Sequence, residues 1–289
     1  MYNVAVIGKG SYIGGHIASE LRLKGMTVTE VDSLDNKWSD FDFASVDTVI
    51  HVAAIVHRKD ITDHLIYEAI NVQLPLEVAR RAEEAGVKQF VFMSSMAVYG
   101  KGHVLKNCCI EPGDLLNPTT EYAKSKLKAE QKLQQTIKGD MILSIIRPPS
   151  VYGRGCKGNL FDKYNKIAKL LPWMPECEPD CLQGVVHIDN LCRAVYAIVK
   201  DRKAGCYHPQ DDVLLSTAEL LGEIRKLQGK KTCISRFLGK VLSVFSFLVI
   251  YKKLFGAVYY SPKFKEYEAL ECPTTTTRDG LKRTYCGKK

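Results

Sequence analysis

The first 150 residues alternate short apolar runs with stretches of helical periodicity. Apolar runs of this length, separated by helical segments, are typical of buried parallel strands in βαβ units. The expected strands are Val4–Ile7, Thr27–Val31, Val49–Ala53, Phe90–Met93 and Ile142–Ile146, and the clearest helices are Ile13–Lys24 and Thr119–Leu133. The pattern therefore predicts an α/β fold with a doubly wound, Rossmann-type parallel sheet.

The pattern changes in two places. Between Ser33 and Asp47 the chain is too short for a full strand-helix-strand unit, so we expect a trimmed third strand there. After Gly153 the alternation stops and prolines become frequent, which indicates a smaller, irregular second domain. We place the two domains at residues 1–151 and 152–289, and expect a strand near 184–189 and the following helix to return to the first.

The longest apolar run lies within Phe237–Tyr251 and is followed by Lys252 and Lys253. It is well short of the roughly 20 residues that a membrane-spanning helix needs. Two interpretations remain: a buried helix of the second domain, which its length favours, or a helix that lies in a membrane interface. Ser216 and Glu219 form a capping-box pattern that starts another helix.

Composition places the chain among ordinary globular proteins, with 46% hydrophobic and 25% charged residues. The start of the sequence has no signal-peptide pattern, so we expect a cytoplasmic protein without a transmembrane segment. The ten cysteines contain no CxxC pair, which favours reduced thiols, and we expect no metal site.

The net charge of +9 is concentrated at the end of the chain. Residues from Lys226 to Lys289 include 14 Lys or Arg and 4 Asp or Glu. Such a region can meet an anionic partner, although a solvated surface is the simpler interpretation. No nucleic-acid motif accompanies it, so nucleic-acid binding is not expected.

The first expected strand ends in the glycine-rich turn Gly8-Lys-Gly10-Ser11-Tyr12-Ile13-Gly14. Glycines between a strand and a helix let the backbone approach a pyrophosphate, which then lies at the helix N-terminus. The register G-x-G-x-x-G would put Ile13 at the third glycine, whereas G-x-x-G-x-x-G gives Gly8, Ser11 and Gly14. Asp32 ends the second strand without a following arginine, and an acidic side chain there favours the ribose of NAD over the 2′-phosphate of NADP.

Tyr122 and Lys126 lie four residues apart and therefore on one face of the expected helix. A nearby ammonium favours the phenolate form of a tyrosine, which can then act as a base. Ser94 and Ser95 follow the strand Phe90–Met93 at its carboxyl end, the edge where open α/β sheets bind ligands.

These motifs together resemble the extended short-chain dehydrogenases/reductases of the NAD-dependent nucleotide-sugar epimerase/dehydratase family, similar to UDP-glucose 4-epimerase. The segments that carry the resemblance are Gly8–Gly14, Val49–Ala54, Asn71-Val72, Ser94–Gly100, Tyr122–Lys126, Arg147–Gly153 and Val186–Leu191. The resemblance implies an NAD-binding domain over residues 1–151 and a substrate-binding domain over residues 152–289.

The resemblance also implies roles for individual residues. Ser95, Tyr122 and Lys126 would be catalytic. The cofactor would be bound by Gly8, Gly10, Ser11, Tyr12, Ile13, Gly14, Asp32, Ala53, Ala54, Asn71, Ser94, Tyr122, Lys126 and Pro149. The substrate would meet Ser95, Ser150, Asn159 and Gln183, although relatives commonly carry a diphosphate-binding arginine where this chain has Gln183-Gly184. The charge of the missing arginine would then come from Arg154, Lys157 or a basic C-terminal residue.

The activity implied is C4 epimerisation of a UDP-hexose through a transient 4-keto sugar, for surface-polysaccharide precursors. Tyr122 would take the proton of the sugar 4-hydroxyl while the NAD accepts hydride. An NAD(P)H-dependent 4-keto nucleotide-sugar reductase and a non-catalytic NAD-binding regulatory or interaction protein are the alternatives. A dehydratase fits less well, because Met96 and Ala97 stand where that group has an acid pair. A homodimer is compatible with each enzyme.

Overall fold

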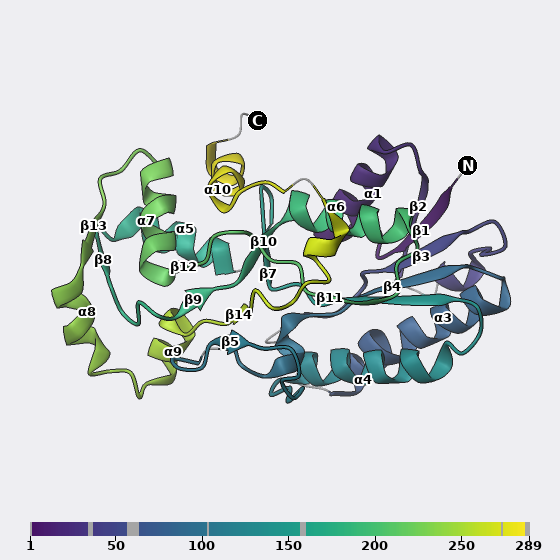
Figure 1. Cartoon of the computed structure of the whole chain (residues 1–289), viewed down its shortest axis with the longest axis horizontal. Coiled ribbons are helices and arrows are strands. Elements are labelled where there is room, and N and C mark those ends of the chain that lie inside the picture. The colour runs from purple at the N-terminus through teal and green to yellow at the C-terminus, as the bar shows by residue number, and fades with distance from the viewer. Residues whose placement is uncertain are drawn as a thin grey trace.

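The computed structural model describes residues 2–33, 37–56, 64–102, 104–156, 160–272 and 274–286. Its centre is a six-stranded parallel sheet with the strand order β11-β6-β4-β3-β1-β2 (Figure 1). The strands are β1 (Asn3–Ile7), β2 (Thr27–Val31), β3 (Thr48–His51), β4 (Gln89–Met93), β6 (Ile142–Ile146) and β11 (Gly205–Tyr207). The five strands expected from the sequence are all present.

Helices cover both faces of this sheet (Figure 1). Helices α1 (Tyr12–Leu23) and α6 (Ile188–Lys200) pack on one face, and α3 (Leu74–Glu84) and α4 (Glu121–Thr136) pack on the other. Successive strand residues point to opposite faces. In β1, Val4 and Val6 therefore join the core under α1 and α6, whereas Ala5 and Ile7 join the core under α3 and α4.

The connection between β2 and β3 is short, as the sequence predicts. The trimmed third strand expected between Ser33 and Asp47 is absent from its described part, which contains only the 3₁₀ helix Lys37–Asp40. The chain runs from β1 outward to β2 and then crosses to β3 on the other side of β1. The strand order therefore reverses between β1 and β3, and a ligand is expected beyond the carboxyl ends of these strands. A short helix α2 (His64–Tyr67) and a π-helix (Glu68–Gln73) lead from there into α3.

A second group of elements lies at the other end of the molecule (Figure 1). Helices α5 (Leu160–Leu170), α7 (Thr217–Leu227) and α10 (Thr277–Cys286) share one apolar core. Four two-stranded sheets accompany them: β7–β10 (Ser150–Tyr152, Val185–His187), β9–β12 (Leu182–Gln183, Leu215–Ser216), β8–β13 (Trp173–Pro175, Cys233–Ser235) and β5–β14 (Cys109–Ile110, Tyr259–Tyr260). The capping box at Ser216 is present at the start of α7. Strand β10 stays outside the central sheet, and it is α6 and β11 that return to it.

The expectation of one buried helix over Phe237–Tyr251 is wrong. The segment forms α8 (Arg236–Ser243), a turn and α9 (Val249–Phe255). Gly239 of α8 packs so closely on the backbone of Glu176 that a Cβ atom there would lie 2.1 Å from its carbonyl oxygen. This contact fixes one face of α8 against the protein and turns the opposite, apolar face outward. Within the described residues, no helix is long and apolar enough to cross a membrane.

Candidate functional site

The turn between β1 and α1 has the geometry of a phosphate-binding loop. Gly8 has φ 124° and Gly10 has φ 79°, conformations that other residues rarely adopt. The Ser11 hydroxyl caps α1 by accepting a 3.1 Å hydrogen bond from the backbone N–H of Gly14. A Cβ atom on Gly14 would lie 2.5 Å from that hydroxyl oxygen. These contacts favour the register G-x-x-G-x-x-G, in which Gly8, Ser11 and Gly14 are the small residues at the closely packed positions of the turn.

Tyr12 and Ile13 turn toward the protein. Ile13 packs against the core under α1 and α6. The Tyr12 hydroxyl is buried, and burial raises its pKa. It lies where a Cβ atom on Gly153 would be 2.6 Å away, so this glycine allows the tyrosine to pack. Any contact of these two residues with the cofactor stays a prediction.

The second and third strands end beside the glycine turn. The backbone N–H groups of Gly8 and Lys9 both donate to the carbonyl oxygen of Val31, at 3.0 and 3.1 Å. This pair places Asp32, the next residue, directly beside the turn, as a ribose-binding carboxylate requires. On the other side, the N–H of Ala53 donates to Ile7 at 3.0 Å, and a Cβ atom on Gly8 would lie 3.0 Å from that nitrogen. Ala53 and the half-buried Ala54 therefore flank the same opening.

Asn71 is fully buried and connects three segments. Its amide oxygen accepts from the N–H of Ile55 at 2.8 Å. Its amide nitrogen donates to the Ile55 carbonyl at 3.0 Å and to the Ser125 hydroxyl at 2.9 Å. These bonds tie the chain after β3 to helix α4. Asn71 therefore positions the loop after Ala54 relative to the helix that carries Tyr122.

Ser95, Tyr122 and Lys126 come together at the carboxyl end of β4. Ser95 caps the 3₁₀ helix Met96–Tyr99 by accepting from the N–H of Ala97 at 3.2 Å. Burial raises the pKa of Tyr122 to about 12, and a hydrogen bond with Ser95 partly opposes this shift. Lys126 is 1% exposed and donates from Nζ to the carbonyl oxygen of Met93 at 2.7 Å. Ser95 is thus hydrogen-bonded to Tyr122, and Lys126 points to the end of β4, but Lys126 is not among the groups that shift the pKa of the tyrosine. The catalytic roles of the three residues stay predictions.

A buried polar network behind this site was missed by the sequence analysis. Glu130 is 2% exposed, forms a 2.6 Å ion pair with Arg147 and accepts a hydrogen bond from the Ser94 hydroxyl. Arg147 also donates to the Tyr99 hydroxyl at 2.9 Å, and Tyr99 lies 3.0 Å from Nε2 of His208. The Ser94 side chain is thus turned toward Glu130. Glu130 follows Lys126 by four residues, a spacing that places both on one face of α4 and could have revealed it.

The residues expected to meet the substrate occupy different environments. Pro149 is buried after β6, and Ser150 is exposed at the start of β7. Gln183 is 6% exposed, and its amide nitrogen donates to Thr217 Oγ1 at 2.9 Å and to the Tyr164 hydroxyl at 3.3 Å. Its side chain therefore connects β9 with α5 and α7. Asn159 and Lys157 lie outside the described residues.

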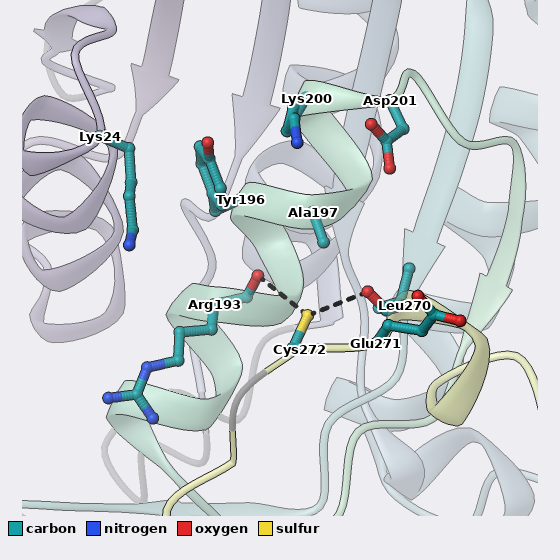
Figure 2. Close-up of a pocket in the computed structure, with 9 residues that line it drawn as sticks. All are labelled: Lys24, Arg193, Tyr196, Ala197, Lys200, Asp201, Leu270, Glu271 and Cys272. Atoms are coloured by element: carbon teal, nitrogen blue, oxygen red, sulfur yellow. Dashed lines mark hydrogen bonds between the residues drawn. The ribbon is translucent and has the colours of Figure 1, made fainter.

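A separate pocket lies between α1, α6 and the 3₁₀ helix Glu268–Leu270 (Figure 2). Cys272 faces it, with Sγ 3.5 Å from the carbonyl oxygen of Arg193 and 3.6 Å from that of Leu270. None of the residues predicted for the cofactor or the substrate lines this pocket. The candidate site therefore lies at the carboxyl ends of the central strands and is separate from this pocket.

The fold defines a class: an α/β protein with a doubly wound, Rossmann-type parallel sheet. The sequence profile of the NAD dependent epimerase/dehydratase family matches residues 4–207. The chain belongs to this family, and NAD is its cofactor. The close approach allowed by Gly8 and Gly14, with Asp32 beside them, fits the pyrophosphate and ribose of that cofactor.

Comparison with individual proteins gives the same class. The chain is 28% identical over 253 residues to a UDP-glucose 4-epimerase of Vibrio cholerae, covering 80% of this chain and 77% of that protein. It is 28% identical over 250 residues to an N-acetyl-alpha-D-glucosaminyl-diphospho-ditrans,octacis-undecaprenol 4-epimerase of Escherichia coli O157:H7, covering 79% and 73%. The fold is similar to that of a UDP-glucuronic acid 4-epimerase from Bacillus cereus, with a TM-score of 0.76, 18% identity and coverage of 99% and 96%.

Proposed function

We propose that the protein interconverts C4 epimers of a UDP-hexose through a transient 4-keto sugar. The observation that carries this proposal is the hydrogen-bonded pair of Ser95 and Tyr122 at the end of β4, with Lys126 on the same helix face. Bound NAD supplies a reversible hydride acceptor. Two hydrogen-bonded hydroxyls can together bind the sugar 4-hydroxyl, and Tyr122 can take its proton. Because the pKa of Tyr122 is about 12, this transfer needs added positive charge near the phenol.

Similarity to the Vibrio cholerae enzyme supports UDP-glucose or UDP-galactose, or an N-acetylated relative, as substrate. The side chain of Gln183 is held by Thr217 and Tyr164 and carries no charge for a diphosphate. Another cation is therefore needed. Of the two replacements named individually in the sequence analysis, Arg154 and Lys157, Arg154 lies among the described residues, exposed on the chain after β7.

Product analysis tests this activity. The purified protein is incubated with each UDP-hexose, first without added cofactor and then with NAD, NADH or NADPH. We expect the C4 epimer to form without consumption of reduced cofactor. Stoichiometric use of NADH or NADPH on a 4-keto sugar nucleotide, without an epimer, would establish the reductase instead. A protein that binds NAD and turns over none of these substrates would be the regulatory alternative.

A second substrate class is favoured by one observation. The surface of α8 and α9 is both apolar and basic, and the Escherichia coli relative is named for a sugar linked through diphosphate to undecaprenol. We therefore also propose a polyprenyl-diphosphate N-acetylhexosamine as substrate, which would serve surface-polysaccharide synthesis. Epimerisation of this lipid, with no turnover of UDP-N-acetylglucosamine, would select this class over the first.

A further inference from the structure

Large apolar side chains are exposed together on α8, α9 and the turn between them. Those most exposed are Phe237 at 78%, Val244 at 69%, Phe247 at 70%, Val249 at 66% and Ile250 at 75%. Contiguous apolar side chains on a protein surface mark an interaction site more often than scattered ones do. We call residues 236–253 the α8–α9 surface. In Figure 1 it forms the end of the molecule farthest from the central sheet.

The packing of α8 explains why these side chains face outward. Gly239 lies against the backbone of Glu176, and Leu242 packs on Tyr251 and Phe255. Phe237, Val241 and Val244 follow one another at spacings of four and three residues, which places them together on the opposite side. In α9, Tyr251 and Phe255 are buried and anchor the helix. The packed side of each helix thus fixes its orientation, and the apolar side chains on the other side remain exposed to solvent.

The charge around this surface is mostly positive. From residue 224 to residue 265 the sequence contains ten Lys or Arg and no Asp or Glu. The adjoining segment carries three carboxylates, of which two are engaged: Glu176 pairs with Arg236 at 2.9 Å, and Glu178 accepts from the Tyr251 hydroxyl at 3.1 Å, while Asp180 is exposed. No ion pair joins Lys252 or Lys253 to a described carboxylate.

We propose that the α8–α9 surface docks on an anionic lipid bilayer and lies in its interface. Phe237, Phe247 and Ile250 enter the acyl boundary, while Lys252 and Lys253 meet lipid phosphates. Apolar side chains beside lysines are the chemistry by which helices bind membrane surfaces. Trp173, 63% exposed on the strand that pairs with β13 just before α8, extends the surface with a side chain suited to this depth.

A bilayer fits this surface better than a second copy of the chain does. In a two-fold symmetric dimer the same patch faces itself, so these lysines and arginines would be brought together. Like charges at such a contact repel, and no carboxylate between residues 224 and 265 would offset them. An anionic bilayer instead offers opposite charge and an apolar interior. The proposal concerns binding and does not depend on the activity proposed for Tyr122.

Vesicle flotation of the full chain tests the proposal. Vesicles of phosphatidylglycerol and phosphatidylethanolamine are compared with phosphatidylcholine alone, at low and high salt. We expect binding to the anionic vesicles that weakens with salt. Phe247→Ser/Ile250→Ser and Lys252→Glu/Lys253→Glu should each weaken it by about tenfold or more.

Matched controls lie on the other half of the molecule. Leu23 and Leu115 are 82% and 86% exposed, so Leu23→Ser/Leu115→Ser makes the same chemical change away from the α8–α9 surface. This variant, Lys88→Glu/Lys138→Glu and Tyr122→Phe should all bind vesicles like the wild type. Failure of the wild type to bind anionic vesicles would overturn the proposal. So would a dimer, detected by sedimentation, that Phe247→Ser/Ile250→Ser converts to a monomer while vesicle binding is unchanged.

Discussion

Lys126 is tied to Met93 by a 2.7 Å hydrogen bond from its Nζ to the carbonyl oxygen at the end of β4. The ammonium also lies 4.7 Å from the centre of the Phe92 ring. Burial lowers the pKa of Lys126 to about 7, and the negative charge of Glu130 partly opposes this shift. The lysine is therefore held at the strand edge where the cofactor and substrate are expected, in an environment that disfavours its charge.

Replacing Lys126 separates its contribution to activity from its effect on stability. Because its folded pKa is lowered, the unfolded chain binds more protons between about pH 7 and the ordinary lysine pKa. The lysine thus destabilises the fold most at and below neutral pH, and this effect declines as the pH rises through that range. We expect Lys126→Met to unfold at equal or higher denaturant concentration than the wild type at about pH 6, with a smaller difference at about pH 9. Turnover and NAD affinity should both fall. A large loss of stability at about pH 6 would show that the lysine is structural.

Tyr122→Phe removes the phenolic oxygen and leaves the ring in place. We expect turnover to fall by about a hundredfold to ten-thousandfold, the range for loss of a general acid or base, with NAD affinity nearly unchanged. Steady-state kinetics and NAD titration measure the two effects. Tyr285→Phe, in α10 outside the candidate site, is the matched control and should retain full turnover. Near-normal activity of Tyr122→Phe would rule out the proposed mechanism.

Asp32 is expected to set the choice between NAD and NADP. It directly follows Val31, whose carbonyl oxygen accepts from the glycine turn, and a carboxylate at this position can accept hydrogen bonds from ribose hydroxyls and repel a 2′-phosphate. Asp32→Ala should weaken NAD binding and narrow the difference between the two cofactors by about tenfold. Asp40→Ala, a nearby exposed carboxylate, should leave the ratio as it is. Equal affinity of the wild type for both cofactors would contradict the role given to Asp32.

Local patterns predicted most of the central sheet and the cofactor turn. Short apolar runs indicated the strands, because a strand buried on both faces consists almost entirely of hydrophobic residues. The turn from Gly8 to Gly14 and the spacing of Tyr122 and Lys126 depend on residues close in sequence, so they could be found without the fold. The register of the glycines needed the structure, since only contacts such as that of Gly14 with Ser11 distinguish the two spacings.

Contacts between distant segments could not be predicted in the same way. Glu130 belongs to a helix rich in charged residues, so the sequence suggests a surface position for it. Its partner Arg147 follows β6, and the sequence does not show that the two residues meet. The apolar residues of Phe237–Tyr251 read as core, because hydrophobicity alone does not show which side of a helix is covered. The close packing of Gly239 on the backbone of Glu176 determines which side of α8 is covered, and Glu176 lies 63 positions earlier in the chain.

His51 is the last residue of β3 in the central sheet. It is fully buried in β3, and neither ring nitrogen has a hydrogen-bond partner in another described residue. The rings of Phe90 and Phe92 lie 6.2 and 6.1 Å away, measured between centroids. Burial, together with the charge of Lys126, lowers the pKa of His51 to about 3.

This lowered pKa predicts how stability depends on pH. Below the ordinary histidine pKa the unfolded chain takes up a proton that the folded chain does not, so stability falls as the pH drops from about 6.5 toward 3. The slope is at most about 1.4 kcal/mol per pH unit for this one group. His51→Leu should therefore unfold with a smaller dependence on pH between about 6.5 and 4.5, and should be more stable than the wild type at the acid end. Chemical denaturation across this range measures the difference. If the profiles of His51→Leu and the wild type are parallel, a hydrogen-bond partner or a buried water molecule must stabilise the charged form of His51.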